Sequence, residues 1–597
     1  MIYLLYMILT LIGIILTLVP FLLVFYFKDK FRIFLYIIAF DFAFHILIAF
    51  FTQVFHIFTY PVIITIHTLV AIGVVSFMIK FKEKFSKIKI NWFLILAVVI
   101  IFFELWSVHN FYTGPVNTIN GSDTVSQSTY VYPYFSDEWI GASLENYSIK
   151  NNSLPTVNPL DANKYFKNPM LVFFSVISEF FLLFNLNPIF HVSFFALFSG
   201  IFVCLSIYLI LKSFGIGNFI SIFTILSIPF ITNGANLPGI WYLMPFLVSF
   251  IFFIISLIGI NSDDKKLSWI TTFLSLVIYP PMVVFIVPVF IADYFTKNIS
   301  DHEVRVRNFS MNLSVILCAG VFVSIVVFWG SEASLFIKNI FTYLFRTNLD
   351  GGIPSFPIWN IIPIIFFPFI LLGIWEILKK KLYFILGPII VGFIFWLFYT
   401  STMKVFLIDY PRVVVITSIL LVFCGGLGID FLIKWLKQRY VFLNNKNFEN
   451  VFVFVLFIIF IVLSFFYPVS QNWEKLKLNV NMNGVIKKFS PASPINRYLV
   501  EDDLRLFNSI SEKRFIAPAW KGLVIGVATG NYPLESKSST ITNKILLYSN
   551  FIKANCEDKT KLSKKYKIDY VYSTKFSCSG FDWLGVSEEK LNLYKVF

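Results

Sequence analysis

Long apolar stretches separated by short polar connections occupy most of the chain before residue 468. A helix needs about 20 apolar residues to cross the hydrocarbon core of a bilayer, so the pattern predicts an all-α polytopic membrane protein with about fourteen transmembrane helices. Two short stretches meet at Tyr279-Pro280-Pro281 and are expected to form a broken pair, because proline ends a helix. The predicted spans are Met1–Phe27, Ile33–Phe58, Pro61–Ile79, Asn91–Val108, Ile189–Leu211, Gly217–Asn233, Trp241–Ile260, Leu267–Tyr279, Pro281–Phe295, Asn308–Trp329, Pro357–Leu378, Leu382–Thr400, Val413–Ile433 and Asn450–Tyr467.

Basic residues gather in alternate connections between these spans. Clusters at 28–32, 80–89 and 379–381 are separated by connections that carry few lysines or arginines. Cytoplasmic loops carry the excess of positive charge in membrane proteins, so we expect these clusters in the cytoplasm. The amino terminus, the 109–188 segment and the tail after Tyr467 are then expected on the extracytoplasmic side of the cell membrane.

Two large segments outside the spans are polar. Residues 109–188 are rich in turn-forming Asn-Gly, Leu-Pro and Asn-Pro steps, and residues 468–597 have the composition of a globular domain. We expect the tail to form a small mixed α/β domain on the outer face. Its expected strands are Phe515–Ala517, Leu523–Val527 and Tyr570–Ser573, and its expected helices are Asp502–Ile510 and Cys556–Tyr566.

Two amphipathic pieces accompany these segments. The 330–356 connection contains the stretch Leu335–Phe345, which is typical of a lid or an interfacial helix. Residues 170–185 carry Glu179 among apolar neighbours. Because the following span already crosses the membrane, we expect 170–185 to lie along the membrane surface.

Composition narrows the class of protein further. The residues AVILMFWYC make up 58% of the chain and charged residues 14%, whereas soluble domains have about 45–50% apolar and about 25% charged residues. These values exclude a disordered chain, a collagen, a disulfide-rich miniprotein and an ordinary cytosolic enzyme. The net charge of +15 is accounted for by cytoplasmic loops and a basic outer tail, so no nucleic-acid partner is expected.

An acidic pair, Asp137 and Glu138, stands at the start of a predicted helix in the first large outer segment. Successive helical residues point about 100° apart, so the two carboxylates cannot face one small site equally. Asp137 is the stronger candidate for chemistry, because the positive end of the helix dipole favours an anion in the first turn. The alternative is that Ser136 or Asp137 only caps the helix.

The acidic pair is the first of a series of motifs. The series is Ser136–Ile140, Leu154-Pro155, Asn158–Leu160, Asn168-Pro169, Pro238–Tyr242, Tyr279–Pro281, Tyr410–Arg412, Glu501–Leu504, Ile516–Trp520, Thr529-Gly530 and Lys567–Tyr572. The order and placement of these motifs resemble those in members of the GT-C superfamily of polyprenyl-phosphate-dependent membrane glycosyltransferases. The resemblance covers about 91–597 and implies a GT-C-like core at 91–467, an extracytoplasmic domain at 468–597, and three additional helices in 1–90. Many relatives carry a basic residue after the Thr-Gly step, where this chain has Asn531.

The resemblance implies transfer of a sugar from a polyprenyl-phosphate donor, with inversion, to an extracytoplasmic acceptor. The acceptor is a cell-envelope glycan, a lipid-linked glycan or a protein, and the donor tail lies among membrane lipids. Asp137 matches the first acid of the family, as general base or metal ligand, and Glu138 is its catalytic partner. The phosphate leaving group develops negative charge, which a nearby cation or a divalent metal, Mg²⁺ or Mn²⁺, stabilises.

Four basic residues at the outer boundary are candidates for binding the donor phosphate. Arg412 and Lys404 bracket the connection after the span that ends at Thr400, Arg346 lies in the 330–356 connection, and Lys164 lies in the first outer segment. Arginine suits phosphate through its planar fork of donors. Each of the four can instead be an interfacial residue whose charged end reaches water.

The histidines are scattered. His109 and His191 flank the first outer segment and are weak candidates for metal ligands, with an ordinary interfacial histidine as the alternative. His45 and His56 share the second span with Asp41. Ionisable groups inside a membrane point to function by default, but this span lies outside the resembling region, so helix packing is the preferred interpretation.

Five cysteines divide into two groups. Cys204, Cys318 and Cys424 lie in predicted spans and are interpreted as small apolar residues. Cys556 and Cys578 both lie in the outer tail, where an oxidising compartment permits a disulfide. A disulfide and two free thiols both stay open, because sequence does not give the distance between the two residues.

Other functions stay open beside the first. An oligosaccharide ligase or polymerase would use a lipid-diphosphate donor. A transporter or flippase would show inverted-repeat symmetry and a polar site at the membrane midplane, whereas the polar groups here concentrate in outer loops. A scaffold with a degenerate site would show no activity with a lipid-phosphate sugar.

Overall fold

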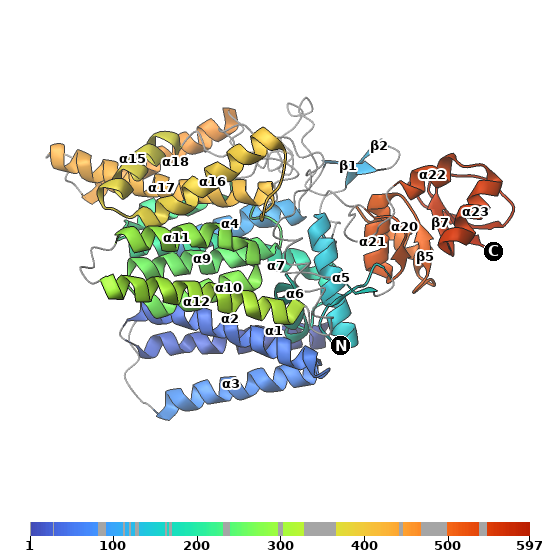
Figure 1. Cartoon of the computed structure of the whole chain (residues 1–597), viewed down its shortest axis with the longest axis horizontal. Helices are drawn as coiled ribbons and strands as arrows, with labels where there is room; N and C mark the ends of the chain where they lie inside the picture. Colours follow the sequence, from blue (N-terminus) through green and yellow to red (C-terminus); the bar gives the residue numbers. More distant parts are fainter. Residues whose placement is uncertain are drawn as a thin grey trace.

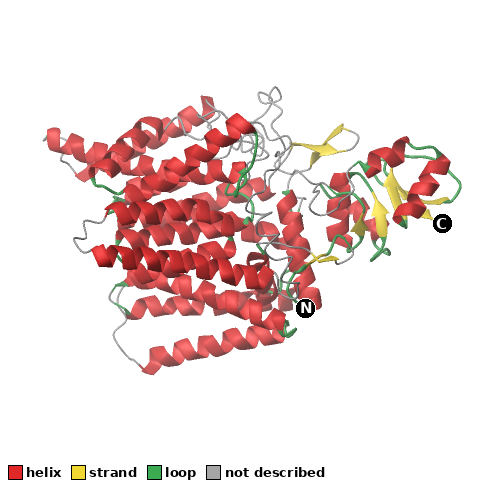
Figure 2. Cartoon of the chain, viewed as in Figure 1, coloured by secondary structure: helices red, strands yellow, loops and turns green. Residues whose placement is uncertain are grey.

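A computed structural model shows a bundle of long, roughly parallel helices with a separate α/β domain at one end (Figures 1 and 2). The amino terminus lies at the same end of the bundle as that domain. The structure describes residues 2–27, 29–80, 91–110, 114–118, 121–125, 131–161, 164–165, 170–230, 239–296, 302–327, 366–440, 446–466, 498–536 and 546–597.

Apolar helices make up the bundle, and every predicted span overlaps one of them. Six helical segments among the described residues are long and apolar enough to cross a membrane, so the class of membrane protein is confirmed, while the number of fourteen spans stays a prediction. The helices are α1 (Ile2–Leu18), continued by the 3₁₀ helix η1 (Val19–Tyr26), α2 (Lys30–Val54), α3 (Tyr60–Lys80), α4 (Trp92–Asn110), α7 (Pro188–Ser213), α8 (Asn218–Leu226), α9 (Pro245–Asn261), α10 (Lys265–Ile278), α11 (Val283–Thr296), α12 (His302–Val327), α15 (Phe367–Lys379), α16 (Tyr383–Thr402), α17 (Tyr410–Arg439) and α18 (Lys446–Phe466).

Helix α17 lies in the centre of the core, with 94% of its most apolar window buried. Its neighbour α15 approaches it at glycines: a Cβ on Gly373 would meet the backbone of Cys424, and one on Gly428 would meet the backbone of Phe369. Because lipid tails are as apolar as leucine, helices in membranes associate through close packing of small residues of this kind.

The expected broken pair is present. Helices α10 and α11 are separated by the 3₁₀ turn Pro280–Met282, and Tyr279 before it is fully buried. Serine hydroxyls join α10 to α9, with Ser249 Oγ 2.9 Å from Ser275 Oγ. The break therefore ends α10 at a fixed place and leaves the Tyr279 side chain inside the protein.

Two helices of the first outer segment cover one end of the bundle. These are α5 (Ser136–Asn151) and α6 (Leu171–Leu183), accompanied by the antiparallel strand pairs β1 (Gly114–Thr118) with β2 (Gly121–Val125) and β3 (Val157–Asn158) with β4 (Lys164–Tyr165). The expectation that 170–185 lies along the membrane surface stays a prediction, but α6 is not exposed to lipid, because it is buried along nearly its whole length and packs against α2, α3 and α5. Apolar residues on all sides of a helix indicate such burial.

The tail forms a mixed α/β domain, as expected. A five-stranded sheet has the order β6-β5-β7-β9-β8, in which β5 pairs parallel with β6 and β7, and β9 pairs antiparallel with β7 and β8. A disulfide joins Cys556 to Cys578, whose Cα atoms are 5.4 Å apart. The strands are β5 (Arg514–Ile516), β6 (Tyr532–Pro533), β7 (Tyr570–Ser573), β8 (Phe581–Val586) and β9 (Asn592–Val596), and the helices are α20 (Glu501–Phe507), α21 (Ala519–Thr529), α22 (Leu547–Lys553) and α23 (Cys556–Tyr566).

One predicted strand of the tail is wrong. Leu523–Val527 forms the middle of α21, which ends at Gly530 in the left-handed region with φ 72°. A short apolar run fits a buried helix as well as a buried strand, and here the helix is sandwiched between the sheet edge and α5. Gly526 on α21 comes so close to Leu160 that an added Cβ would lie 3.0 Å from that side chain. The tail domain is therefore packed onto the first outer segment.

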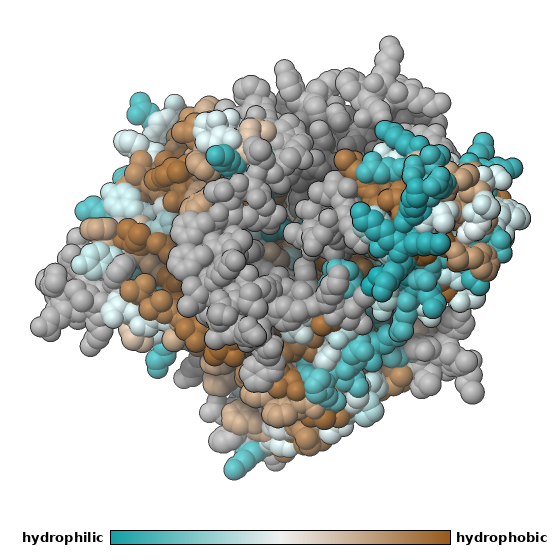
Figure 3. Space-filling model, turned by 45° about the vertical axis from the view of Figure 1, so that its right-hand side comes forward, coloured by the Kyte–Doolittle hydropathy of each residue, from teal (hydrophilic) through white to brown (hydrophobic). Residues whose placement is uncertain are grey.

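The hydropathy of the surface agrees with the division into a membrane-type helical bundle and a polar tail domain. Hydrophilic residues gather on the side that carries the tail domain, while hydrophobic residues spread over the helical bundle (Figure 3). Large apolar side chains such as Phe40, Leu47 and Leu69 are exposed on α2 and α3. Exposed apolar surface of this extent is typical of helices that face lipid.

Candidate functional site

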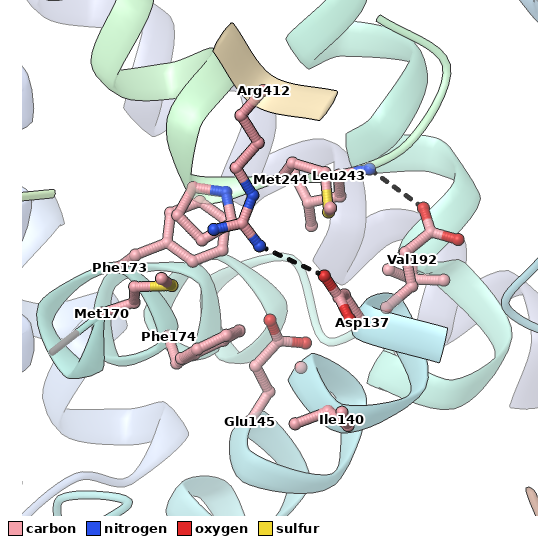
Figure 4. A pocket seen from close by; sticks show the side chains of 13 residues that line it. Asp137, Ile140, Glu145, Met170, Phe173, Phe174, Val192, Leu243, Met244 and Arg412 are labelled. Carbon is pink, nitrogen blue, oxygen red and sulfur yellow. Dashed lines mark hydrogen bonds and ion pairs between the residues drawn. The ribbon is translucent and has the colours of Figure 1, made fainter. Parts of the chain in front are cut away.

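The first turn of α5 is fixed by Glu138. Its Oε2 accepts hydrogen bonds from the backbone N–H groups of Tyr134 (3.1 Å) and Phe135 (3.2 Å), and its Oε1 accepts one from Leu243 N (2.9 Å). Phe135 occupies the N-cap position, which the alternative interpretation gave to Ser136 or Asp137. Burial raises the pKa of Glu138 to about 7, against the opposing effect of the three N–H donors. Glu138 therefore ties α5 to the turn before α9 (Figure 4).

Asp137 has different surroundings although it is the next residue. Its side chain is 41% exposed, and its Oδ2 lies 3.4 Å from Nη2 of Arg412. Figure 4 shows the two side chains pointing toward each other across the pocket, one from α5 and one from α17. The structure thus brings together two site residues that the sequence separates by 275 positions.

Arg412 is held in place from three directions. It lies in the first turn of α17, where its Nη1 is 2.7 Å from the Asp409 carboxylate and donates a 2.9 Å hydrogen bond to the Tyr279 hydroxyl. The guanidinium also stands 5.4 Å from the centre of the Tyr279 ring. Its side chain is 14% exposed. A partly buried arginine with one nitrogen facing a pocket is a preorganised binding group for an anion.

Glu145 is a site residue that sequence reasoning missed. It lies on α5 two turns after Glu138, is 1% exposed, and lines the pocket. Figure 4 shows its carboxyl group pointing up into the space below Asp137. Burial, with a smaller contribution from the charge of Glu138, raises its pKa well above the usual value, and its Oε2 has no hydrogen-bond partner within the described residues. The seven-residue spacing from Glu138 places both on one helix face, which is the signal that could have identified it.

These side chains surround a pocket of about 150 Å³. Its wall is mainly apolar, and four charged or acidic side chains reach it: Asp137, Glu138, Glu145 and Arg412. The lining consists of Asp137, Glu138, Ile140, Gly141, Glu145, Met170, Phe173, Phe174, Val192, Leu243, Met244, Pro245 and Arg412. Small-molecule sites have this character: a largely apolar cavity with a few convergent polar groups.

Of the other predicted phosphate ligands, Lys404 is the one whose side chain the structure describes, and it is not among the residues that line this pocket. Lys404 is exposed in the connection between α16 and α17, and Lys164 lies in β4. Arg346 and the amphipathic stretch Leu335–Phe345 lie outside the described residues. Asn531, where many relatives have a basic residue, is buried and donates from Nδ2 to the carbonyl of Ile510 (2.8 Å).

The predicted metal ligands are not gathered around Asp137. His109 is buried, and its Nε2 hydrogen-bonds the carbonyl of Trp241 at 2.7 Å. His191 bonds the Asn187 carbonyl within its own helix. The group of three metal-ligating side chains found among the described residues is a different one, His45, His67 and Glu179, so a divalent metal is compatible with this chain.

The fold and the pocket define a class: a polytopic membrane protein with a helical core, a pocket between the 109–188 segment and the ends of the core helices, and an α/β domain at the same end of the bundle. No family model matches the chain, and no curated protein matches its sequence. The apo crystal structure of the oligosaccharyltransferase from Archaeoglobus fulgidus superposes with a TM-score of 0.51 at 11% identity, covering 81% of this chain and 69% of that one. Apo ArnT from Cupriavidus metallidurans gives a TM-score of 0.48 at 11% identity, covering 84% of this chain and 97% of that one. The chain thus shares its overall fold with that oligosaccharyltransferase.

Proposed function

We propose that this protein is a membrane glycosyltransferase that transfers a sugar from a polyprenyl-phosphate donor to an extracytoplasmic acceptor, with inversion. The observation that carries the proposal is the pairing of Asp137 and Arg412 across an apolar pocket at one end of the bundle. A carboxylate and a fixed cation that line one pocket, 3.4 Å apart, supply a proton acceptor and a phosphate-binding group once the substrates separate the pair. The fold of the archaeal oligosaccharyltransferase supports the same class of reaction.

The chemistry follows from the positions of these groups. The acceptor hydroxyl attacks the anomeric carbon, and the partly exposed Asp137 carboxylate takes its proton. The bond between the anomeric carbon and the phosphate oxygen breaks, and Arg412 stabilises the charge that develops on the leaving phosphate. Tyr279 and Asp409 keep the guanidinium oriented, so that little reorganisation is needed during the reaction.

Glu138 and Glu145 take supporting roles in this proposal. Glu138 accepts three backbone hydrogen bonds and positions Asp137 at the start of α5. Burial raises the pKa of Glu145, which favours the protonated acid, and in that form it offers a hydrogen-bond donor to a sugar hydroxyl inside the pocket. A Mg²⁺ or Mn²⁺ ion at Asp137 is not required in this mechanism, because Arg412 supplies the positive charge; chelator in the assay tests that point.

The proposed arrangement in the membrane has fourteen spans. Three additional helices in 1–90 precede a GT-C-like core at 91–467, and the domain at 468–597 is extracytoplasmic, in the cytoplasmic membrane of the cell. The acceptor is a cell-envelope glycan, a lipid-linked glycan or a protein. A lipid-diphosphate donor, as used by a ligase or polymerase, would occupy the same pocket with one further phosphate.

The experiment is a transfer assay with purified full-length protein in detergent. Short-chain polyprenyl-phosphate and polyprenyl-diphosphate sugars are offered separately, and release of the polyprenyl carrier is measured with and without acceptor extract. Asp137→Asn keeps the size of the side chain and removes the anion, so the rate should fall by about 10²–10⁴-fold with an unchanged melting temperature. An Asp137→Asn rate within about threefold of the wild type would contradict general-base catalysis by this residue. Absence of transfer with every lipid-phosphate donor, together with movement of lipid across vesicles, would favour the transporter instead.

A further inference from the structure

Three side chains of the metal-ligand type meet inside the protein beside α6. His45 comes from α2, His67 from α3 and Glu179 from α6. His45 Nδ1 is 2.8 Å from one oxygen of Glu179, and His67 Nε2 is 2.7 Å from the other. One ligand atom of each residue lies within 4.8 Å of the others. The three helices are therefore joined at a single point.

The charge balance of this cluster is unusual. His45 is 1% exposed, His67 is 4% exposed and Glu179 is fully buried. Asp41 stands one helical turn before His45, with its carboxylate 3.8 Å from His45 Nε2. Within the described part of the chain, no lysine or arginine pairs with Asp41 or Glu179. Burying a carboxylate without a compensating charge costs several kcal/mol, so this site needs positive charge, which a protonated imidazole or a bound cation can supply.

The ligand set indicates which cation supplies that charge. Two imidazoles and one carboxylate are a common three-residue set for zinc, with a fourth position left for water or another oxygen ligand. Ligand atoms around a tetrahedral zinc ion with bonds of about 2.0 Å lie roughly 3.3 Å apart, about half an ångström more than the gaps between the histidines and Glu179. Asp41 lies on the other side of His45, 3.8 Å from its Nε2, where a small shift would let it accept a hydrogen bond from the imidazole, as carboxylates behind metal-bound histidines do. Two negative charges then face one divalent ion.

We propose that His45, His67 and Glu179 bind one zinc-type divalent metal ion, which joins the first helices of the chain to α6. The same helix contributes Phe173 and Phe174 to the wall of the pocket, less than two turns before Glu179. The site therefore fixes the wall of the pocket from behind, at a distance from Asp137 and without entering the reaction. The proposal stands apart from the proposed sugar transfer, because its readouts are metal content and stability.

The test uses the full-length protein in detergent, carrying an affinity tag without histidines. The double variant His45→Asn/His67→Gln keeps a side-chain N–H near each nitrogen that contacts Glu179, so the hydrogen bonds persist while metal ligation is lost. His56→Asn is the matched control: it removes an exposed histidine at the end of the same helix, and asparagine tolerates its positive φ of 57°. Each protein is saturated with Zn²⁺, passed over a chelating resin and analysed for metal by mass spectrometry.

We expect about one zinc ion per chain in the wild type and in His56→Asn, and almost none in the double variant. Protein prepared from zinc-depleted cells should gain thermal stability on titration with Zn²⁺ until one equivalent is bound, and the double variant should show no such gain. A wild type that retains no zinc and does not respond to it overturns the proposal, as does a double variant that retains as much zinc as the wild type. Should the double variant fail to fold, X-ray absorption of the zinc-loaded wild type decides: two imidazole ligands support the site, and none refutes it.

Discussion

Neighbouring residues of this chain differ in role because tertiary contacts differ. Asp137 and Glu138 are adjacent on α5, yet one faces Arg412 across the pocket and the other accepts three backbone hydrogen bonds in the interior. The helical rotation of about 100° between them predicts that they diverge. It does not indicate which one faces the pocket, since that depends on the turn before α9 and on the start of α17.

Arg412 gives a prediction about donor binding. Arg412→Lys keeps the charge but loses the planar fork that reaches Tyr279, Asp409 and the pocket together. We expect KM for the lipid-phosphate donor to rise roughly tenfold, with a smaller change in kcat. Lys380→Gln, an exposed residue at the C-cap of α15 that does not line the pocket, is the control and should leave KM unchanged. Equal KM values for Arg412→Lys and the wild type would remove Arg412 from donor binding.

Glu145 gives a prediction about pH. Its folded-state pKa is raised above the usual 4.5 by burial, so the folded chain keeps a proton that the unfolded chain releases. The stability that this group contributes is complete below about pH 4.5 and declines as the pH rises toward the folded pKa. Glutamine mimics the protonated acid, so Glu145→Gln should raise the melting temperature at pH 8 more than at pH 5.

The control for this measurement is Glu557→Gln, a substitution on the surface of α23 at a side chain that is 77% exposed. It should shift the melting temperature little at either pH. A Glu145→Gln variant whose melting temperature differs from that of the wild type by the same amount at pH 5 and pH 8 would show that Glu145 has no raised pKa in the folded chain.

At the scale of helices and strands, burial in the folded chain decided the type and position of segments that the periodicity of apolar residues left ambiguous. Helix α6 and residues 523–527 of α21 are apolar on several sides, and such runs are compatible with a surface helix, a buried helix or a strand. Packing of α6 against α2, α3 and α5, and of α21 against α5, settles both cases. Other helix boundaries were predicted correctly. Helix α23 begins at Cys556 and ends at Tyr566 as expected, and the prolines after Tyr279 separate α10 from α11.

The disulfide of the tail gives a prediction at this scale. Cys556 at the start of α23 is joined to Cys578, 22 residues later, ahead of β8. Closing a loop of this length restricts the unfolded chain, so Cys556→Ser/Cys578→Ser should lower the stability of the tail domain by about 3 kcal/mol. The loss in unfolding free energy is measured by denaturant titration, with cleavage of the tail by protease as the probe of its unfolding. Peptide mass spectrometry without reductant should detect the linked pair, and two free thiols in protein purified from membranes of intact cells would refute it.

At the scale of the whole molecule, one end of the bundle carries everything connected with the site. The amino terminus, α5, α6 and the tail domain share that end (Figure 1). The alternation of basic connections predicts that this end is extracytoplasmic. The prediction concerns the orientation of the entire protein, because α5 and the tail domain pack together and must lie on one side of the membrane.

Cysteine labelling tests the orientation. In a variant without native cysteines, Asn151→Cys on α5 and Ser509→Cys in the tail are both at exposed positions and should react with an impermeant maleimide on intact cells. Ser262→Cys, exposed in the connection between α9 and α10, should react only after permeabilisation. Labelling of only one of the first two positions would break the predicted topology, and labelling of Ser262→Cys alone would invert it.

The sequence by itself determined the class of protein, the positions of the apolar helices and the two large polar segments, and it singled out Asp137 and Arg412 as candidate site residues. These features depend on local composition, on the length a helix needs to cross a bilayer, and on the order of motifs along the chain. Only the tertiary structure decided that Asp137 and Arg412 face each other, that Glu145 lies buried below them, and that His67 and Glu179 meet His45. Such contacts join residues far apart in the chain, and no periodicity of the sequence records which helix packs against which.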